Sequence, residues 1–371
     1  MSRVVELTSK LVKFNTTNPP GNEGEITRFL ADFMHDIGMK VQVWEISSGR
    51  LGVIGRLEGG VDRVLVFNGH TDVVPPGDNW ASPPFEATVQ EKDGKLFGRG
   101  TSDMKGAIAS MIVAFEKLAK VPKAQRPHLE LHLVPDEEDA GKGAVYLVEN
   151  EMVKADAAVF GEPTNLQVNI AEKGAAWMKA RCYGLAAHAS VPFNGINSIN
   201  KAAEVIMKLE KGMPQILKPK THPLVGEATI NIGTITGGTR VNTVPDFCEF
   251  TIDRRMIPGE IADNVLEEIR RVVGDLAQIE LFHVEEPAET LEQERIVTVA
   301  RQSVTKIVGK DLGIGGFVGS TDARFYINQV GVPSIILGPG SMKVAHQVNE
   351  FVEIAELEKA VEIYFDIALS F

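Results

Sequence analysis

The chain has 371 residues, 44% hydrophobic and 24% charged, which is ordinary for a globular protein large enough for two domains. Its formal net charge of -12 argues against binding to nucleic acid or to an anionic membrane, because both favour a basic surface. Two cysteines cannot form a disulfide framework, and no stretch approaches 18 consecutive apolar residues or forms an N-terminal signal core. These features predict a cytoplasmic protein.

The first 170 residues alternate between helical and extended patterns. Apolar residues at helical spacing or in short runs predict helices at 4–14, 25–39, 104–119 and 143–150, and strands at 41–44, 51–57, 64–67, 128–134 and 157–160. The runs at 64–67 and 157–160 are continuously apolar, as is typical of strands that are buried on both faces. This pattern predicts an α/β domain with a largely parallel, mixed sheet flanked by helices.

From about Gly174 the pattern changes. Strands are expected at 176–183, 228–236, 248–254 and 278–284, with helices at 196–211 and 261–276. This strand-helix-strand-strand-helix-strand order is typical of a small α+β domain of the ferredoxin-like type. The α/β pattern resumes with a helix at 294–308, a strand at 332–337 and a helix at 353–369. We therefore expect one domain formed by residues 1–174 and 285–371, with a second domain inserted at 175–284.

Histidine and acidic residues stand at the ends of three predicted strands and before one predicted helix. The sequence is Asn-Gly-His-Thr-Asp after the first strand, Pro-Asp-Glu-Glu-Asp after the second and Gly-Glu-Pro after the third. The side chains concerned are His70, Asp72, Asp103, Glu137, Glu138 and Glu162, joined far along the chain by His346. Because ligands of open α/β sheets gather at the carboxyl ends of the strands, we expect these residues to meet around Asp103 and bind two metal ions.

Histidine and carboxylate without thiolate form the ligand set of zinc, cobalt or manganese acting as a Lewis acid. Two metals that share a bridging carboxylate can activate one water molecule between them. Glu137 and Glu138 are adjacent, so one can bind metal while the other acts as a general base. Each of these residues alone has a structural explanation: His70 could be a core histidine and Asp103 a helix N-cap. Their shared position at the ends of strands and at the start of a helix instead favours a metal site.

The order of these motifs resembles the M20 metallopeptidases. The motifs are His-x-Asp, Gly-Arg-Gly-x-x-Asp-Met-Lys-Gly, Asp-Glu-Glu, Gly-Glu-Pro, an Ala-His-Ala at 187–189 and a late histidine, and they cover essentially the whole chain. More narrowly, the chain is similar to the branch of acetylornithine deacetylase, succinyl-diaminopimelate desuccinylase and aminoacylase. The resemblance implies that residues 1–174 and 285–371 form a catalytic metal-binding domain and that 175–284 form a lid and dimerisation domain.

The resemblance also implies a ligand set. One zinc ion would be held by His70 and Glu162, the other by Glu138 and His346, and Asp103 would bridge both. The implied cofactor is two Zn²⁺ per subunit, with Co²⁺ or Mn²⁺ as alternatives.

Three further residues match catalytic positions of the family. Glu137 matches the general base, and Asp72 matches the residue that orients the ligating histidine. His188, in the inserted domain, matches the histidine that reaches the active site of the partner subunit and stabilises the oxyanion.

Four residues match substrate contacts. Asn242 matches a substrate-binding asparagine, and Arg255 matches the arginine that binds a substrate carboxylate, although Arg254 beside it leaves a one-residue ambiguity. Ser320 and Thr321 lie in a Gly-Ser-Thr-Asp segment that resembles the loop near that carboxylate.

The resemblance therefore implies a homodimeric, dizinc amidohydrolase that removes a succinyl or acetyl group from an N-acyl amino acid. The alternative within the family is a dipeptidase or carboxypeptidase, which shares the metal centre and differs in the substrate pocket. A non-catalytic metal-binding protein of the same fold is a third interpretation. Such a protein would be expected to lack Glu137 or a ligand, and here every position is filled.

Overall fold

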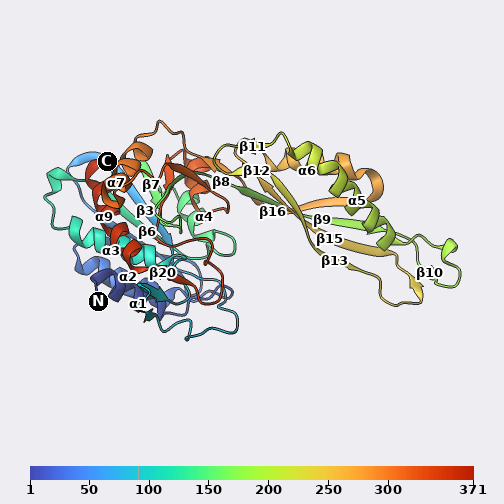
Figure 1. The fold of residues 1–371 in the computed structure, drawn as a ribbon, viewed down its shortest axis with the longest axis horizontal. Coiled ribbons are helices and arrows are strands. Elements are labelled where there is room, and N and C mark those ends of the chain that lie inside the picture. The colour runs from blue at the N-terminus through green and yellow to red at the C-terminus, as the bar shows by residue number, and fades with distance from the viewer. Residues whose placement is uncertain (91) are drawn as a thin grey trace. The chain divides into compact units, whose positions relative to one another are not determined.

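A computed structural model describes residues 1–90 and 92–371 and divides them into two compact units (Figure 1). The first unit consists of Met1–Ile170, Thr290–Gly315 and Thr321–Phe371. The second consists of Ala171–Glu289 and Gly316–Ser320. Among the described residues, no helix is both long enough and apolar enough to cross a membrane.

The first unit is built on a mixed sheet whose strands follow the order β1-β2-β6-β3-β7-β19-β8. Their bounds are β1 Lys40–Ser47, β2 Arg50–Leu57, β3 Val61–His70, β6 Pro127–Val134, β7 Ala157–Phe160, β8 Val168–Glu172 and β19 Ser334–Ile336. Strand β3 runs parallel to β6 on one side and to β7 on the other, and β19 is parallel to β7. Antiparallel pairing joins β1 to β2, β2 to β6 and β19 to β8. The predicted mixed sheet is therefore confirmed.

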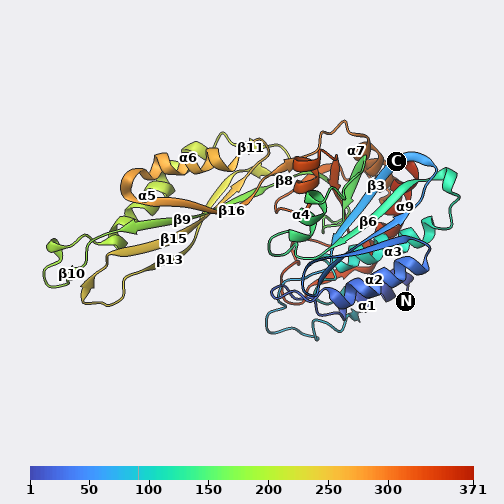
Figure 2. The same cartoon turned by 180° about the vertical axis from the view of Figure 1, so that it is seen from behind.

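Helices cover both faces of this sheet (Figure 2). They are α1 Arg3–Val12, α2 Gly24–Asp36, α3 Lys105–Leu118, α4 Lys142–Glu149, α7 Arg295–Val308, α8 Ala323–Phe325 and α9 Ile354–Ser370. On one face Phe67 of β3 packs edge-on against Phe115 of α3 and Tyr364 of α9. On the other face Tyr326, directly after α8, lies against Phe160 of β7. The alternation of side chains along the strands thus gives each face its own helical layer.

Short strands complete the first unit and its loops. β4 Thr88–Gln90, β5 Lys95–Phe97 and β20 Phe351–Glu353 form a three-stranded antiparallel sheet. β18 Ile314–Phe317 pairs with β8, and β17 Ala288–Glu289 pairs with β8 at Ala171 and Glu172. The sequence predicted a hairpin turn at 91–95, and β4 and β5 pair on either side of this segment, although residue 91 lies outside the described residues. Strands β8, β17, β18 and β20 were not predicted, because such short runs carry too little periodicity.

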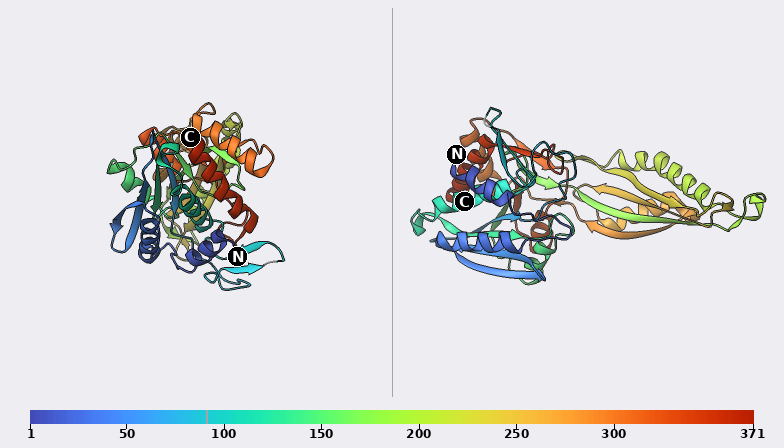
Figure 3. Two further views of the ribbon diagram at one scale, coloured as in Figure 1. Left: turned by 90° about the vertical axis from the view of Figure 1, so that its left-hand side faces the viewer. Right: turned by 90° about the horizontal axis from the view of Figure 1, so that it is seen from below.

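The second unit has a four-stranded antiparallel sheet in the order β13-β15-β9-β16. Its elements are β9 Gly174–Tyr183, α5 Ser198–Leu217, β13 Thr229–Gly237, β15 Phe247–Met256, α6 Ala262–Val273 and β16 Gln278–Glu285. Helices α5 and α6 pack together against the sheet, and the right-hand view of Figure 3 shows α5 lying along it. The chain order is the strand-helix-strand-strand-helix-strand order that the sequence predicted. Small pairs β10 Ala187–His188 with β14 Thr243–Val244, and β11 Thr221–His222 with β12 Gly226–Glu227, lie in its loops.

The predicted end of the helix at residue 211 was wrong. Helix α5 continues to Leu217, six residues further, and contains Pro214. Buried Met213 and Leu217 keep the last turn packed against the core, so tertiary packing outweighs the cost of the proline.

Candidate metal centre

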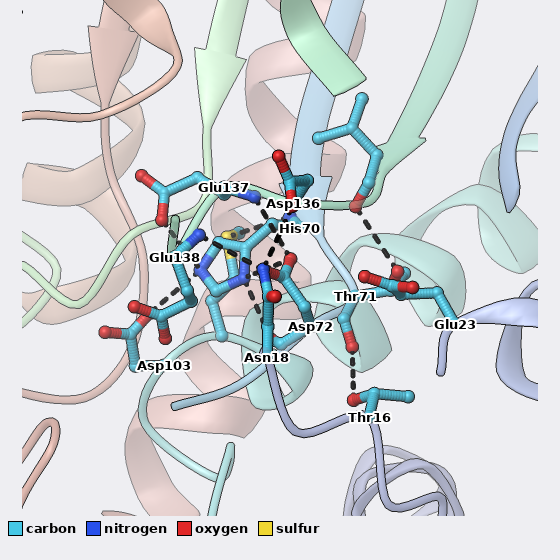
Figure 4. A network of polar contacts seen from close by, with 12 residues as sticks. Thr16, Asn18, Glu23, His70, Thr71, Asp72, Asp103, Asp136, Glu137 and Glu138 are labelled. Carbon is cyan, nitrogen blue, oxygen red and sulfur yellow. Dashed lines mark hydrogen bonds and ion pairs between the residues drawn. The ribbon is translucent and has the colours of Figure 1, made fainter. Parts of the chain in front are cut away.

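The carboxyl ends of β3, β6 and β7 bring the predicted ligands to one edge of the sheet (Figure 4). His70 is the last residue of β3. Glu137 and Glu138 follow β6, and Glu162 follows β7. Because these three strands are parallel neighbours, the loops after them meet, and Asp103 reaches the same point from the turn before α3.

Asp103 lies between two histidines. Its Oδ1 is 3.0 Å from His70 Nε2, and its Oδ2 is 3.2 Å from His346 Nε2. Glu138 Oε2 also lies 3.0 Å from His346 Nε2, while Glu162 Oε1 lies 3.8 Å from His70 Nε2. Donor atoms of His70, Asp103 and Glu138 all lie within 4.8 Å of one another. The five predicted ligands therefore converge, with one oxygen of Asp103 toward each histidine.

The turn that carries Asp103 is shaped by two glycines. Gly100 has a φ of +88°, a left-handed conformation that side chains disfavour. A Cβ on Gly106 would lie 2.3 Å from the Thr101 carbonyl oxygen, so the first turn of α3 closes only on a glycine. The N-cap of α3 is Met104 and has no side-chain cap, which leaves the Asp103 carboxylate for the centre. The alternative interpretation of Asp103 as a helix cap is wrong.

The Glu350 side chain holds this turn by hydrogen bonds to its backbone, and sequence reasoning missed this residue. Its Oε1 accepts hydrogen bonds from the backbone N–H groups of Gly100, Ser102 and Asp103 at 3.0, 2.8 and 3.1 Å. Its Oε2 forms a buried ion pair with Arg99 at 2.5 Å. Because Glu350 belongs to the loop of His346, it joins the two segments that supply ligands. Its only sequence signal is an acidic residue four positions after the late histidine.

Asp72 supports the centre through the backbone as well as through the imidazole. His70 Nδ1 lies 3.0 Å from the Asp72 carbonyl oxygen and 3.6 Å from its carboxylate. That carboxylate accepts hydrogen bonds from the N–H groups of Glu137 and Glu138, both at 3.2 Å, and from Asn18 Nδ2 at 2.9 Å. Asp72 thus orients the histidine mainly by its carbonyl group and the two glutamates by its carboxylate.

The buried carboxylates repel one another. Burial raises the pKa of Glu162 well above its usual value, and Asp103 and Glu138 raise it further, against the opposing effect of His70. Burial likewise raises the pKa of Glu137 well above its usual value, with Glu162 adding to the increase and His70 opposing it. A cation at this position would remove the cost of ionising these groups.

The residues fit a pair of divalent cations. Glu138 Oε1 is buried and has no hydrogen-bond partner among the residues described, although its other oxygen contacts His346. A buried carboxylate oxygen without a partner is costly unless an ion completes it. The donors are imidazole nitrogen and carboxylate oxygen, the set preferred by zinc and by cobalt or manganese.

Metal binding should release protons near neutral pH. Hydrogen bonds to Asp103 and Glu138 raise the pKa of His346 to about 10 in the metal-free chain, so its imidazole is protonated at pH 7. A metal ion binds only the neutral imidazole, so binding displaces a proton and the affinity rises as the pH rises toward 10. Titration calorimetry of the metal-free protein with zinc at pH 7, in buffers of different ionisation enthalpy, should show net proton release. The His346→Ala variant should release fewer protons, and equal release from both proteins would contradict the assignment.

The second unit brings two of its predicted residues together. His188 pairs with Thr243 in the β10–β14 register, and the N–H of Ala189 donates to the Asn242 carbonyl oxygen at 3.1 Å. Both His188 and Asn242 are exposed. The His188 Nδ1 lies 2.8 Å from Ser190 Oγ, which fixes the ring by one nitrogen.

Arg254 and Arg255 differ in burial and in their ion pairs. Arg254 is fully buried and its guanidinium forms an ion pair with Glu260 at 2.5 Å. Arg255 is half-buried and pairs with Asp253 at 3.1 Å, which leaves it the more accessible of the two. Arg255 lies near one end of β15, and Asn242 and His188 lie near the other.

The remaining two predicted residues stand at a unit boundary. Ser320 is the last residue of the second unit, and Thr321 resumes the first. Thr321 is buried, and its hydroxyl accepts the N–H of Ala323 at 3.1 Å, at the start of α8.

A cluster of histidine and carboxylate side chains at the carboxyl ends of parallel strands suits a metal-dependent hydrolase, and the comparison with known families shows that class. A model of peptidase family M20/M25/M40 matches residues 66–370, and the chain belongs to this family.

Two curated relatives align with nearly the whole chain. One is a probable succinyl-diaminopimelate desuccinylase from Staphylococcus aureus, 26% identical over 99% of this chain and 97% of the relative. The other is an acetylornithine deacetylase from Proteus mirabilis, 31% identical over 91% of this chain and 87% of the relative.

Solved structures of the same family share the fold. An M20 family metallo-carboxypeptidase from Sulfolobus solfataricus has a TM-score of 0.83 at 18% identity, over 100% of this chain and 99% of that one. A dinuclear metal binding peptidase of family M20 from Bacillus subtilis has a TM-score of 0.75 at 16% identity, over 99% of this chain and 97% of that one.

Proposed function

We propose that this protein is a two-metal amidohydrolase that removes a succinyl or acetyl group from an N-acyl amino acid. The observation that carries the proposal is the Asp103 carboxylate, whose oxygens lie 3.0 and 3.2 Å from His70 Nε2 and His346 Nε2. One carboxylate directed at two histidines has the arrangement needed for a ligand shared by two cations. The names of the two curated relatives support acyl amino acids as the substrate class.

His70 and Glu162 would hold one metal ion and Glu138 and His346 the other, with Asp103 common to both. The donor set favours zinc, and cobalt or manganese would suit the same ligands. When bound, such a pair of cations would polarise the acyl carbonyl. It would also lower the pKa of a water molecule, so that hydroxide is available to attack the carbonyl near neutral pH.

Glu137 would act as the general base. Its Oε2 lies 4.0 Å from His70 Nε2, beside the ligands, and its side chain is 13% exposed, so water can reach it. Burial raises the pKa of Glu137 well above its usual value in the metal-free protein, and bound cations would offset that increase, so that the carboxylate is ionised and can accept a proton. Glu137 takes the proton of the attacking water and returns it to the amine nitrogen as the C–N bond breaks. The products are a free carboxylate and a free amine.

His188 would stabilise the oxyanion. Its Nδ1 is engaged by Ser190 Oγ, which leaves Nε2 as the nitrogen that donates a hydrogen bond. Because His188 is exposed, it could complete an active site only when another protein surface packs against it. We infer that this surface belongs to a second copy of the chain.

Replacement of His188 by alanine should lower kcat about 10²- to 10³-fold, the usual effect of losing one oxyanion donor. Bound metal should be unchanged, because His188 lies outside the ligand cluster. The matched control is His35→Ala, which removes another exposed histidine, on α2. Steady-state kinetics with metal analysis checks the prediction, and an unchanged kcat in His188→Ala would refute the role.

Four residues would hold the substrate. Arg255 would bind a substrate carboxylate, since Arg254 beside it is already committed to Glu260. Asn242, exposed next to His188, would contact the scissile group. Ser320 and Thr321 would contribute hydroxyl and backbone groups to the carboxylate site.

Dimerisation through the second unit is part of the proposal. Around the β10–β14 pair this unit exposes large apolar side chains, among them Phe193 at 81% and Val241 at 101% relative exposure. Leu185 and Ile196, which pair with each other nearby, are also exposed. Such a concentration of exposed apolar surface is typical of a protein–protein contact. The second unit would thus be both the dimerisation surface and the carrier of His188.

A peptidase of the same family is the second candidate function. The Sulfolobus neighbour is named a metallo-carboxypeptidase and the Bacillus neighbour a peptidase. A carboxylate-binding Arg255 would serve the C-terminus of a peptide as well as it serves an N-acyl amino acid.

A hydrolysis screen separates the two candidates. The purified protein with zinc or cobalt would be offered N-succinyl-diaminopimelate, N-acetylornithine, other N-acyl amino acids, dipeptides and tripeptides, with amine release as the readout. The proposal expects kcat/KM for one N-acyl amino acid to exceed that for every peptide by at least about tenfold. Higher kcat/KM for peptides would establish the second candidate, and no hydrolysis in either class would refute both.

A further inference from the structure

Arg50 joins two buried carboxylates next to the metal centre. It is the first residue of β2, and its Nε and Nη2 contact Glu23 Oε2 and Oε1, both at 2.6 Å. The same Nη2 donates to Asp136 Oδ1 at 2.8 Å. The guanidinium therefore makes two parallel contacts to Glu23 and a third to Asp136. The ammonium group of a lysine lacks the planar, forked donors that this arrangement requires.

The ion cluster is nearly closed to solvent. The side chains of Glu23 and Asp136 have no exposed surface, and that of Arg50 is 12% exposed. The other cation near Asp136 is Lys142, which is 60% exposed and 3.6 Å from Oδ2. Buried charges require close pairing, so Arg50, at 2.8 Å from Oδ1, is the closest cation that holds the Asp136 carboxylate in place.

Asp136 stands directly before the proposed base. Its φ of +72° is a left-handed conformation that costs energy in a residue other than glycine, so neighbouring contacts must hold it. Asn18 Nδ2 bridges Asp136 Oδ1 at 3.2 Å and Asp72 Oδ2 at 2.9 Å, and Asp72 in turn accepts the N–H of Glu137 (Figure 4). The peptide that carries Glu137 is therefore held on one side by Asp72 and on the other by the side chain of Asp136.

We propose that Arg50 is a positioning residue for Glu137, which it aligns through the Asp136 carboxylate. The proposal rests on the proposed function, because it takes Glu137 as the base. The hydrogen bonds of the Arg50 guanidinium go to Glu23, Asp136 and the Pro20 carbonyl oxygen, none of which is a predicted ligand. Its loss would let the strained Asp136 peptide relax and shift Glu137, and a shift of about 1 Å in a reacting group can cost roughly 10²-fold in rate.

The experiment compares Arg50→Met and Arg50→Lys with Arg56→Met and Arg56→Lys in the zinc-loaded protein. Arg56 lies on the same strand and pairs with Glu130 at 3.1 Å, away from Asp136, so it is a matched control. We expect Arg50→Met to lower kcat about 10²-fold and Arg50→Lys about tenfold. KM should stay within about threefold, with two zinc ions per chain, and both Arg56 variants should keep kcat within about twofold.

A double-mutant cycle tests the route through Asp136. If Arg50 acts only through that carboxylate, Asp136→Asn should lower kcat, and adding Arg50→Met to it should lower kcat little further. Independent, multiplying effects of the two substitutions would overturn the route. If Arg50→Met does not fold, Arg50→Lys decides the proposal by itself.

Two results overturn the positioning role: kcat within twofold of the parent in Arg50→Lys, or a fall in kcat that matches a loss of zinc. Glu137→Gln, measured in parallel, separates this failure from failure of the proposed function. If Glu137→Gln still turns over, the base assignment is wrong. If it is inactive while the Arg50 variants are unaffected, only the inference about Arg50 is wrong.

Discussion

Replacement of Glu137 by glutamine is expected to lower kcat by about 10²- to 10⁴-fold while the protein keeps its metal ions. The amide has nearly the shape of the carboxylate but cannot accept the proton of the attacking water, and positioned proton transfer contributes a factor of this size. Of the two acidic side chains of the cluster without an assigned ligand role, Asp72 accepts the N–H groups of Glu137 and Glu138, which leaves Glu137 as the candidate base. Steady-state kinetics on the best substrate of the screen, with metal analysis of the same sample, measures both quantities.

The control for this variant is Glu149→Gln at the end of α4, which removes an exposed carboxylate close in the chain. It should leave kcat and metal content unchanged. Loss of metal in Glu137→Gln would show that Glu137 is a ligand, and the base would then have to be sought elsewhere in the cluster.

Replacement of Asp103 by alanine is expected to remove both metal ions together and to abolish turnover. Its two carboxylate oxygens are directed at His70 and His346, which belong to different proposed half-sites. Glu162→Ala should instead weaken mainly the metal ion held with His70. Metal analysis after dialysis against buffer of fixed free zinc measures both occupancies.

Comparing the metal content of Asp103→Ala with that of Glu162→Ala tests whether Asp103 is the shared ligand. Asp32→Asn, an exposed aspartate on α2, serves as the control and should retain the metal content of the parent. If Asp103→Ala retained one metal ion at full occupancy, Asp103 would belong to a single half-site and the bridged arrangement would be wrong.

Much of the fold was predictable because its long elements have strong periodicity. The continuous apolar runs of β3 and β7 and the amphipathic helices of both units gave the layers and the order of the second unit's elements. Short strands such as β8 and β18 were not predicted, because they are defined by their partners rather than by their own sequence. The end of α5 was placed too early. The burial of Leu217 keeps the last turn helical despite Pro214, and local sequence does not reveal that burial.

The residues at the strand ends were predictable because topology alone brings them together. Their supports were not, since Glu350 and Arg50 act through side chains that reach segments distant in sequence. Lys105 is a third example. It is fully buried, and its Nζ donates to the Phe14 carbonyl oxygen at 2.7 Å, so it joins the start of α3 to the segment after α1. Nothing in the local sequence distinguishes a lysine of this kind from an exposed one.

The proposed function depends most on Asp103, which we infer bridges two metal ions at the carboxyl edge of the sheet. Anomalous diffraction at the zinc absorption edge, from crystals of the zinc-loaded protein, tests it most directly. We expect two peaks, one beside His70 and Glu162 and one beside Glu138 and His346, each in contact with one oxygen of Asp103. A single peak, or two peaks of which only one contacts Asp103, would contradict it.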